Sequence, residues 1–328
     1  MLTIRPFEPT MQAYEDAAKI MNLQRPHFEA TADGLREFDQ YIVTDDTFAR
    51  FIGEVDDQIM AVTSYGQPPR LFGTDKYILE IDLHPSYNQA VYIEKLYDPL
   101  VIELQNRNAI TILTEARETD DVRIQFLEDR HFELVMREHN SMLDLTTFIP
   151  TPIQTASLEK IQKHQITIYT LAELQQHDSG WLAKLEALFW AFRKDIPSGE
   201  PPVRETLPQF QKRFERASFR ADAWFVAVDE TNGMREAGVY VGATHLWLNV
   251  DNVEKVRTGQ TGVLSSHRRC GVATALKLRA LDFAKQLGAK VVTTNNAANN
   301  PMFQINLSFG FKPEPAWLEY RKELIPSV

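Results

Sequence analysis

Cysteine and long apolar runs are scarce in this sequence of 328 residues. It contains one cysteine, Cys270, so no disulfide can form within the chain, which is typical of a reducing cytoplasm. No uncharged apolar run reaches the ~18 residues that a membrane span needs. The segment from Met1 to Phe7 reads as a strand and not as a signal peptide. We therefore predict a cytoplasmic protein that does not bind membranes.

Metal-ligand patterns are also missing, because neither HExxH nor CxxC occurs and the eight histidines show no ligand spacing. We expect no metal. The net charge of −10 disfavours non-specific binding to nucleic acid. This charge is uneven: residues 1–150 hold 13 Lys and Arg against 27 Asp and Glu, whereas the remainder holds 22 against 18. The second half is therefore the better place for a polyanionic ligand.

The length fits two domains of roughly 150 residues, and the two halves share one order of predicted elements. In the first half we predict strands over 2–6, 48–55, 59–65, 77–83, 110–116, 132–137 and 142–148, and helices over 11–21, 90–106 and 122–128. In the second half we predict strands over 166–171, 224–229, 239–248, 255–264 and 290–295, and helices over 180–192, after 273 and up to 309. The fold class is α/β (α+β), with tandem domains over 1–150 and 166–328 and a linker over 151–165. Each domain is predicted to be a mixed central sheet flanked by helices.

The most informative segment runs from Gly262 to Ala273. It reads as the end of an apolar strand, a basic turn, and the start of an amphipathic helix. The first turn of a helix has unpaired N–H groups and a positive dipole end, so it attracts anions, usually phosphate. Gly271 lets the backbone approach a ligand closely, and Arg268 and Arg269 carry charge that suits phosphate oxygens. The segment therefore indicates a phosphate site.

A second pattern follows the basic turn. The short strand from Lys290 to Asn295 precedes Asn299 and a helical stretch that ends at Gly310-Phe311. Glycine at that point can take the left-handed conformation that stops a helix.

With both patterns in register, the sequence resembles the GNAT superfamily of acyl-coenzyme A-dependent N-acyltransferases. Arg268, Gly271 and Ala273 match the family's pyrophosphate-binding pattern of Arg or Gln, two residues, Gly, one residue, then Gly or Ala. Asn299 matches the Asn that contacts the coenzyme arm. Asn306 stands where many members carry a Tyr proposed as general acid. That departure is similar to two-domain members such as the mycothiol synthase-like group.

The resemblance implies an acyl-CoA site in the second domain, with acetyl-CoA as cosubstrate. By that resemblance, backbone N–H groups at Val263 or Leu264 would face the thioester carbonyl. The pyrophosphate would be held by the N–H groups of Arg269, Cys270, Gly271, Val272 and Ala273. The equivalent turn of the first half, residues 84–93, contains no Gly, Arg or Lys, and His131-Phe132 stands in place of Gly310-Phe311. We therefore predict that the first domain is degenerate and has lost coenzyme binding.

The catalytic residues are less well indicated. His245 lies on a strand that would face the acceptor cavity, although an inward histidine is also common in a core. Asn306 can donate a hydrogen bond but supplies no proton as a phenol does, so Ser308 or Tyr320 could substitute. Cys270 has no His or Asp partner pattern, and we expect a small buried or half-buried thiol. Asn306, Tyr320 and His245 are the candidates.

We predict acetyl transfer from acetyl-CoA to a primary amine of a small molecule by direct attack, in a monomer or homodimer. Two alternatives stay open. A non-catalytic CoA-binding module is favoured by Asn306 and by the lack of an evident base. A protein N-acetyltransferase would need an open acceptor groove.

Overall fold

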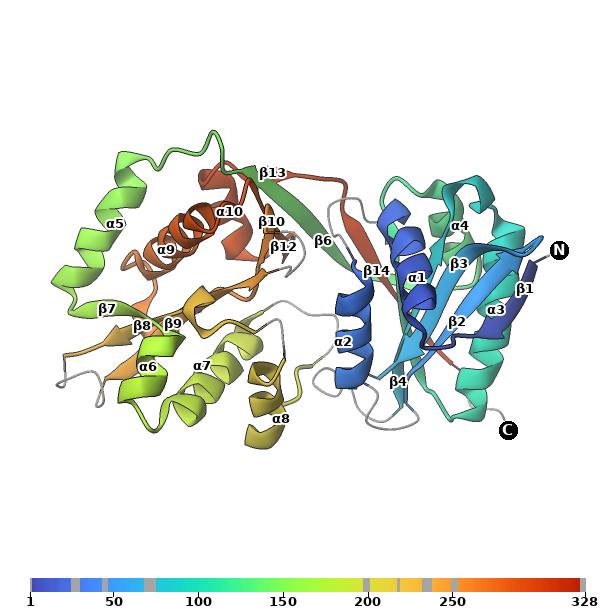
Figure 1. The fold of residues 1–328 in the computed structure, drawn as a ribbon, viewed down its shortest axis with the longest axis horizontal. Coiled ribbons are helices and arrows are strands. Elements are labelled where there is room, and N and C mark those ends of the chain that lie inside the picture. Colours follow the sequence, from blue (N-terminus) through green and yellow to red (C-terminus); the bar gives the residue numbers. More distant parts are fainter. Residues whose placement is uncertain are drawn as a thin grey trace. The chain divides into compact units, whose positions relative to one another are not determined.

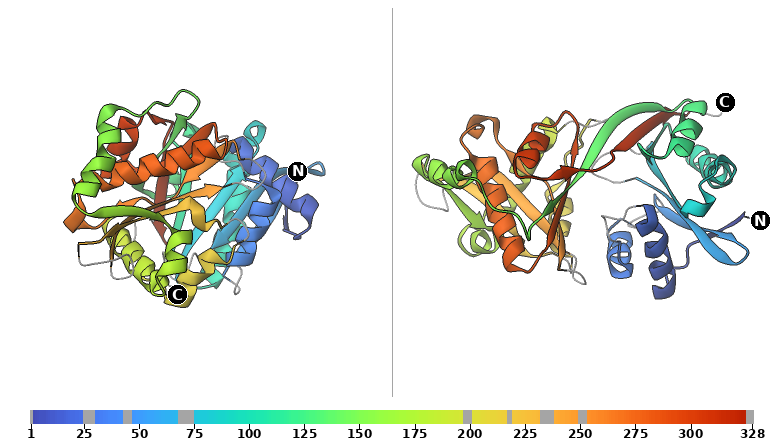
Figure 2. Two further views of the ribbon diagram at one scale, coloured as in Figure 1. Left: turned by 60° about the vertical axis from the view of Figure 1, so that its left-hand side comes forward. Right: turned by 90° about the horizontal axis from the view of Figure 1, so that it is seen from above.

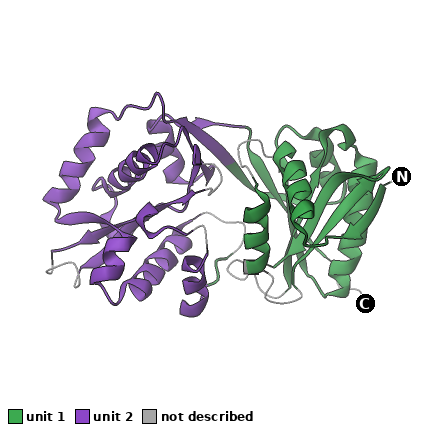
Figure 3. Ribbon diagram, viewed as in Figure 1, with its two compact units in different colours: residues 1–138, 198–203, 315–328 green, residues 139–197, 204–314 purple. Residues whose placement is uncertain are grey.

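The computed structural model describes residues 2–24, 30–42, 47–67, 75–196, 201–216, 219–231, 238–248 and 253–324 (Figure 1). The chain forms two compact units (Figure 3). Unit 1 takes its residues from 1–138, 198–203 and 315–328, and unit 2 takes its residues from 139–197 and 204–314.

The sheet of unit 1 has the strand order β1 (Leu2–Pro6), β2 (Ala49–Val55), β3 (Gln58–Gly66), β4 (Lys76–Leu83), β5 (Thr111–Arg117), β14 (Trp317–Glu323) and β6 (Glu133–Asp144). Neighbouring strands are antiparallel, except that β4 and β5 are parallel. The turn between β2 and β3 is formed by Asp56 and Asp57, which both have positive φ, the conformation of a two-residue hairpin loop.

Helices cover both faces of this sheet (Figure 2). On one face lie α1 (Met11–Gln24) and α2 (Ala32–Ile42), which pack on Ile52 and Val62. On the other face lie α3 (Ala90–Asn106) and α4 (Asp121–Asp129), which pack on the buried side of β4. Unit 1 therefore has an apolar layer on each side of one sheet.

The sheet of unit 2 has the strand order β6, β12 (Val291–Ala297), β10 (Lys255–Thr258), β9 (Val239–Leu248), β8 (Trp224–Asp229) and β7 (Ile166–Thr170). Two short strands lie off this path: β11 (Gly262–Val263) pairs with β9, and β13 (Lys312–Pro313) pairs with β6. One core cluster holds α5 (Pro152–Lys163), α9 (Val272–Gln286) and the end of α10 (Pro301–Ser308). The opposite cluster holds α6 (Leu171–His177), α7 (Trp181–Asp195) and α8 (Leu207–Gln211).

The two units repeat one topology. The series β1-β2-β3-β4-β5 and the series β7-β8-β9-β10-β12 are both antiparallel until the last pair, which is parallel. The predicted fold class, two tandem mixed sheets flanked by helices, is confirmed. Each series is completed by a strand from the other half of the sequence, because β14 lies beside β5 and β6 lies beside β12.

The structure of residues 151–165 differs from the predicted linker, because helix α5 occupies most of this segment. Thr151 and Gln154 form a capping box, with Pro152 in the first turn. Ile161 is buried in the core that α5 shares with α9. The helix has few apolar residues, so its sequence shows little periodicity.

Other differences concern long-range pairing. The strands predicted over 132–137 and 142–148 are one strand, β6, and the strand predicted over 255–264 is divided into β10 and β11. The prediction placed the whole C-terminal segment in the second domain, whereas β14 pairs with β5 and β6 in unit 1. Helices α2, α6 and α8 were not predicted. A strand's partner depends on distant residues, which local patterns do not report.

Candidate functional site

The basic turn connects β11 to α9 in unit 2. Arg269 and Gly271 both have left-handed backbone conformation, with φ of 64° and 89°. Gly271 is the N-cap of α9, and no side-chain cap hydrogen bond is found there among the described residues. The first N–H groups of α9, from Val272 onward, therefore have no acceptor within the helix. Left-handed residues alternating with ordinary ones direct successive N–H groups into a concavity that suits an anion.

The side chains of the turn fall into two groups. Val272 is 1% exposed and Ala273 packs against the core, so they anchor the helix start. The Arg268 Nε donates to the Val263 carbonyl at 3.1 Å, and its Nη2 pairs with Asp195 at the end of α7. The Cys270 thiol is half-buried, as expected, and lies 3.6 Å from the Arg268 carbonyl oxygen. The turn thus holds its backbone in place while its arginines stay at the surface.

The two predicted thioester donors differ in what they bind. The Leu264 N–H donates to the Val241 carbonyl of β9 at 2.8 Å. Hydrogen-bonding direction alternates along an antiparallel strand, so the Val263 N–H is directed away from β9. Of the two, Val263 is therefore the candidate donor to a ligand.

His245 faces the interruption between β10 and β11. A Cβ on Gly259 would lie 1.9 Å from the His245 Nε2, so only glycine fits beside this ring. The ring is 3% exposed and stacks on Trp224, with centroids 3.9 Å apart and planes 11° apart. His245 stands three positions along β9 from Gly242, the register partner of Val263. The fold therefore brings this histidine to the same stretch of β9 as the candidate donor.

Asn306 lies on α10 and is completely buried. Its Nδ2 donates to the Asn296 Oδ1 on β12, and its own Oδ1 has no donor within the part of the chain that the structure describes. Asn299 is exposed, whereas Asn300 caps α10 by accepting from the Met302 N–H at 2.9 Å. Sequence reasoning missed Asn296, because no spacing rule links it to Asn306.

Tyr320 belongs to unit 1, because β14 is part of that unit. It is 2% exposed, and its hydroxyl lies 3.5 Å from Glu128. Burial, with the nearby Glu128 carboxylate, raises the pKa of the tyrosine. The Ser308 hydroxyl donates to the Ile305 carbonyl of its own helix at 2.7 Å. Tyr320 and the basic turn belong to different units, so we do not include Tyr320 in the site.

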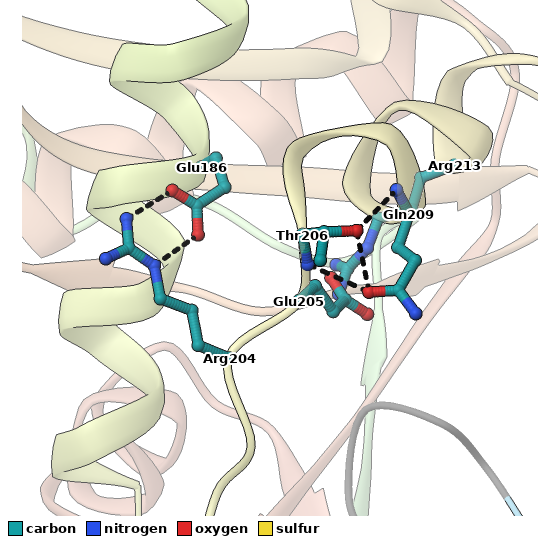
Figure 4. Close-up of polar contacts among 6 residues, drawn as sticks. All are labelled: Glu186, Arg204, Glu205, Thr206, Gln209 and Arg213. Atoms are coloured by element: carbon teal, nitrogen blue, oxygen red, sulfur yellow. Dashed lines mark hydrogen bonds and ion pairs between the residues drawn. The ribbon is translucent and has the colours of Figure 1, made fainter.

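A small pocket lies between α7 and the segment 204–213 of unit 2. Figure 4 draws Glu186, Glu205 and Arg213 of its lining with their polar contacts. Its lining combines aromatic and charged side chains: Glu186, Phe189, Trp190, Arg193, Glu205, Phe210 and Arg213. Both carboxylates are paired with guanidinium groups, Glu186 with Arg204 through two hydrogen bonds of 2.9 and 2.7 Å, and Glu205 with Arg213 at 2.6 Å. The pocket therefore has aromatic walls and neutralised carboxylates. Its wall residue Phe189 also lies beside His245, with ring centroids 5.9 Å apart.

In the described part of the chain, no helix has the length and apolar character needed to cross a membrane. Nor do three or more His, Cys, Asp or Glu side chains gather there in a group that could hold a metal ion.

Residues 185–309 match the acetyltransferase (GNAT) family. The matched segment runs from α7 to the end of α10, and so includes the basic turn, His245 and Asn306. A search of curated proteins found no match to the chain.

Solved structures resemble the whole chain. A tandem GNAT protein from the clavulanic acid biosynthesis pathway is 15% identical, with a TM-score of 0.73 and 100% of both chains covered. A GCN5-related N-acetyltransferase from Sphaerobacter thermophilus is 15% identical, with a TM-score of 0.73, covering 100% of this chain and 97% of that one. A glucosamine N-acetyltransferase region of a fungal multi-domain GH3 β-N-acetylglucosaminidase is 11% identical, with a TM-score of 0.66, covering 98% of this chain and 38% of that one. At these identities the likeness shows the fold. Together with the family match, it confirms the resemblance drawn from the sequence.

Proposed function

We propose that this tandem GNAT protein transfers an acetyl group from acetyl-CoA to the primary amine of a small molecule, at a site in unit 2. One observation carries the proposal. Within the family match, the turn before α9 has left-handed residues at Arg269 and Gly271 and leads into a helix start without a side-chain cap. Such a turn binds anionic groups, and it follows directly on the strand that carries Val263.

The residues of the turn fit the pyrophosphate of acetyl-CoA. The N–H groups from Arg269 to Ala273 would hold it, with the positive end of the α9 dipole behind them. The side chains of Arg268 and its partner Asp195 are 47% and 52% exposed, so their ion pair is weak. Arg268 can therefore exchange Asp195 for a phosphate oxygen at small cost. When bound, acetyl-CoA supplies an acetyl thioester that is already activated toward an amine.

Three residues would act on the reacting groups. The Val263 N–H would donate to the thioester carbonyl, where negative charge develops during attack. His245 would accept the proton of the attacking amine, directly or through a water. Asn306 would position coenzyme or water through its Oδ1, which has no donor among the described residues, since an amide has no acidic proton.

The test uses purified protein, acetyl-CoA and a panel of primary amines, with release of free thiol as the signal. Thiol release that depends on one amine, with the acetylated amine identified by mass spectrometry, would support the proposal. Acetylation of peptides without turnover of any small amine would assign the acceptor to proteins instead.

A second candidate is a non-catalytic CoA-binding module, which Asn306 favours because it cannot serve as an acid. Binding of coenzyme A without turnover of any amine or peptide would select this candidate. Absence of coenzyme binding would refute both.

A further inference from the structure

Lys160 contacts the basic turn from outside the family match, because α5 precedes residues 185–309. Its Nζ donates to the carbonyl oxygen of Arg269 at 2.9 Å. A Cβ on Gly271 would meet the Lys160 Cδ and the Ser157 Cβ at 3.5 Å each. Helix α5 therefore packs over one side of the turn and bonds to its backbone.

Helix α5 is itself held in place, so Lys160 extends from a fixed support. Ile161 is 3% exposed in the core shared with α9. The Gln154 Nε2 donates to the Ser308 carbonyl at the end of α10 at 3.0 Å. The same helix thus contacts the start of α9 and the end of α10, the two helices of the proposed coenzyme site.

The carbonyl that Lys160 binds belongs to a residue in an unfavourable conformation. Arg269 has a φ of 64°, and a left-handed backbone is costly for any residue with a Cβ. An ammonium donor on that carbonyl gives a charge-assisted hydrogen bond, which stabilises the conformation. The adjacent N–H groups then keep the directions that bind an anion.

We propose that Lys160 is a positioning residue for the coenzyme site: it holds the Arg269 carbonyl and so keeps the basic turn in its binding conformation. The inference rests on the proposed function, since it assigns a role in coenzyme binding. It adds to that function a residue that neither the motif nor the family match includes.

The first test compares the affinity for coenzyme A and the KM for acetyl-CoA. Lys160→Met should weaken both by roughly threefold to tenfold, which corresponds to the loss of one hydrogen bond. The kcat at saturation and the KM for the amine should not change. Lys160→Arg should restore most of the affinity, because a guanidinium can donate to the same carbonyl. Lys163→Met, on an exposed position of the same helix, is the matched control and should bind normally.

The second test asks whether Lys160 acts through the backbone of Arg269. Glycine takes a left-handed conformation at little cost, so Arg269→Gly removes the need for support. In that background Lys160→Met should change the affinity for coenzyme A by less than about twofold. The double-mutant cycle subtracts the loss of affinity that comes from removing the Arg269 guanidinium.

An equal loss in both backgrounds would overturn the positioning role, because Lys160 would then act by its charge alone. Normal coenzyme binding by folded Lys160→Met would overturn it too. A wild-type protein that binds no coenzyme would instead refute the proposed function, and this inference with it.

Discussion

Units 1 and 2 stop their corresponding helices in the same way. Two residues after the helix between the parallel strands, which is α3 in unit 1 and α9 in unit 2, stand Asn108 and Gly288, with φ of 59° and 89°. Two residues after the next helix, α4 in unit 1 and α10 in unit 2, stand His131 and Gly310, with φ of 60° and 87°. Both units thus have a residue with left-handed conformation after these helices, although it is a glycine in unit 2 and not in unit 1. That conformation stops the helix and redirects the chain.

The starts of the first of these helices differ. The described segment 84–90 of unit 1 has no residue with positive φ, whereas the turn before α9 has Arg269 and Gly271. In unit 1 the His84 Nδ1 accepts the Ser86 N–H at 3.2 Å, so the polar groups of this turn are used within the turn. A residue with positive φ after a helix stops that helix, which the fold requires in both units. A residue with positive φ before a helix lowers the stability of the folded state. Its presence before α9, and its absence from the described segment before α3, marks the unit that we propose to bind coenzyme.

The largest effect is expected from Gly271→Glu. A Cβ at this position has no contact closer than 3.5 Å, so the variant should fold. The new side chain would put strain on a φ of 89° and place negative charge beside the pyrophosphate. We expect affinity for coenzyme A to fall by more than about 100-fold, since like charges brought together cost several kcal/mol. Calorimetric titration measures this.

The matched control is Gln89→Glu, at the start of α3 in unit 1. It should leave coenzyme affinity unchanged. A folded Gly271→Glu protein that binds normally would show that the left-handed turn is not the phosphate site.

Lysines in the early turns of α3 and α9 give a second contrast. Lys95 of α3 is exposed, whereas Lys277 of α9 is 2% exposed and its ammonium lies 5.3 Å from the centre of the Phe311 ring. Burial lowers the pKa of Lys277 to about 7, while in the unfolded chain it keeps the ordinary value of 10.5. The unfolded state therefore binds more protons between these values, and the cost of burying the ammonium is complete below pH 7.

Lys277→Met should accordingly raise the free energy of unfolding at pH 7 by a few kcal/mol, since each unit of pKa corresponds to about 1.4 kcal/mol. The gain should shrink as the pH rises toward 10. Thermal unfolding at several pH values measures it, with Lys95→Met as control and no expected change. A gain that is independent of pH would mean that the pKa of Lys277 is the same in the folded and unfolded states, so that burial does not lower it.

Asn306 sharpens the comparison at the level of catalysis. It stands four residues before Gly310, and Leu127, a core residue, stands four residues before His131 in unit 1. Asn306→Ala should slow turnover roughly fivefold to tenfold, because one hydrogen bond to ligand or water is lost. Asn306→Leu introduces the residue type that unit 1 has at this position. It should lose as much activity as Asn306→Ala, although the leucine side chain fills the space of the asparagine.

Asn306→Tyr should give no gain, because the position is completely buried and shaped for a shorter side chain. A marked gain with tyrosine, together with a new acidic limb in the pH profile, would show that the wild type lacks a proton donor. That result would favour the non-catalytic module.

The last prediction concerns the number of coenzyme molecules that bind to each chain. Since the start of α9 has residues with positive φ and the described segment before α3 has none, titration of the intact chain should give close to one coenzyme per protein. A value near two would mean that residues 84–93 bind phosphate by another arrangement, and the contrast between the units would no longer mark function.

Features made by neighbouring residues were predictable from the sequence. The turn from Arg268 to Ala273 was found because a helix start, a glycine and two arginines adjoin one another, and the same holds for the helix stop at Gly310. The helix from about Ala90 was also predicted, and α3 begins at that residue. The choice between Val263 and Leu264 was not, because it depends on which N–H the carbonyl of Val241 accepts.

The sequence by itself determined the repeat of strands and helices, the basic turn and the resemblance to one family, because periodicity and turn chemistry are local properties. Only the tertiary structure decided that β14 and Tyr320 belong to unit 1. It also decided that Gly259 makes room for His245 and that Lys160 supports Arg269. These contacts join residues far apart in the chain, and their geometry follows from strand pairing and helix packing, which no single segment encodes.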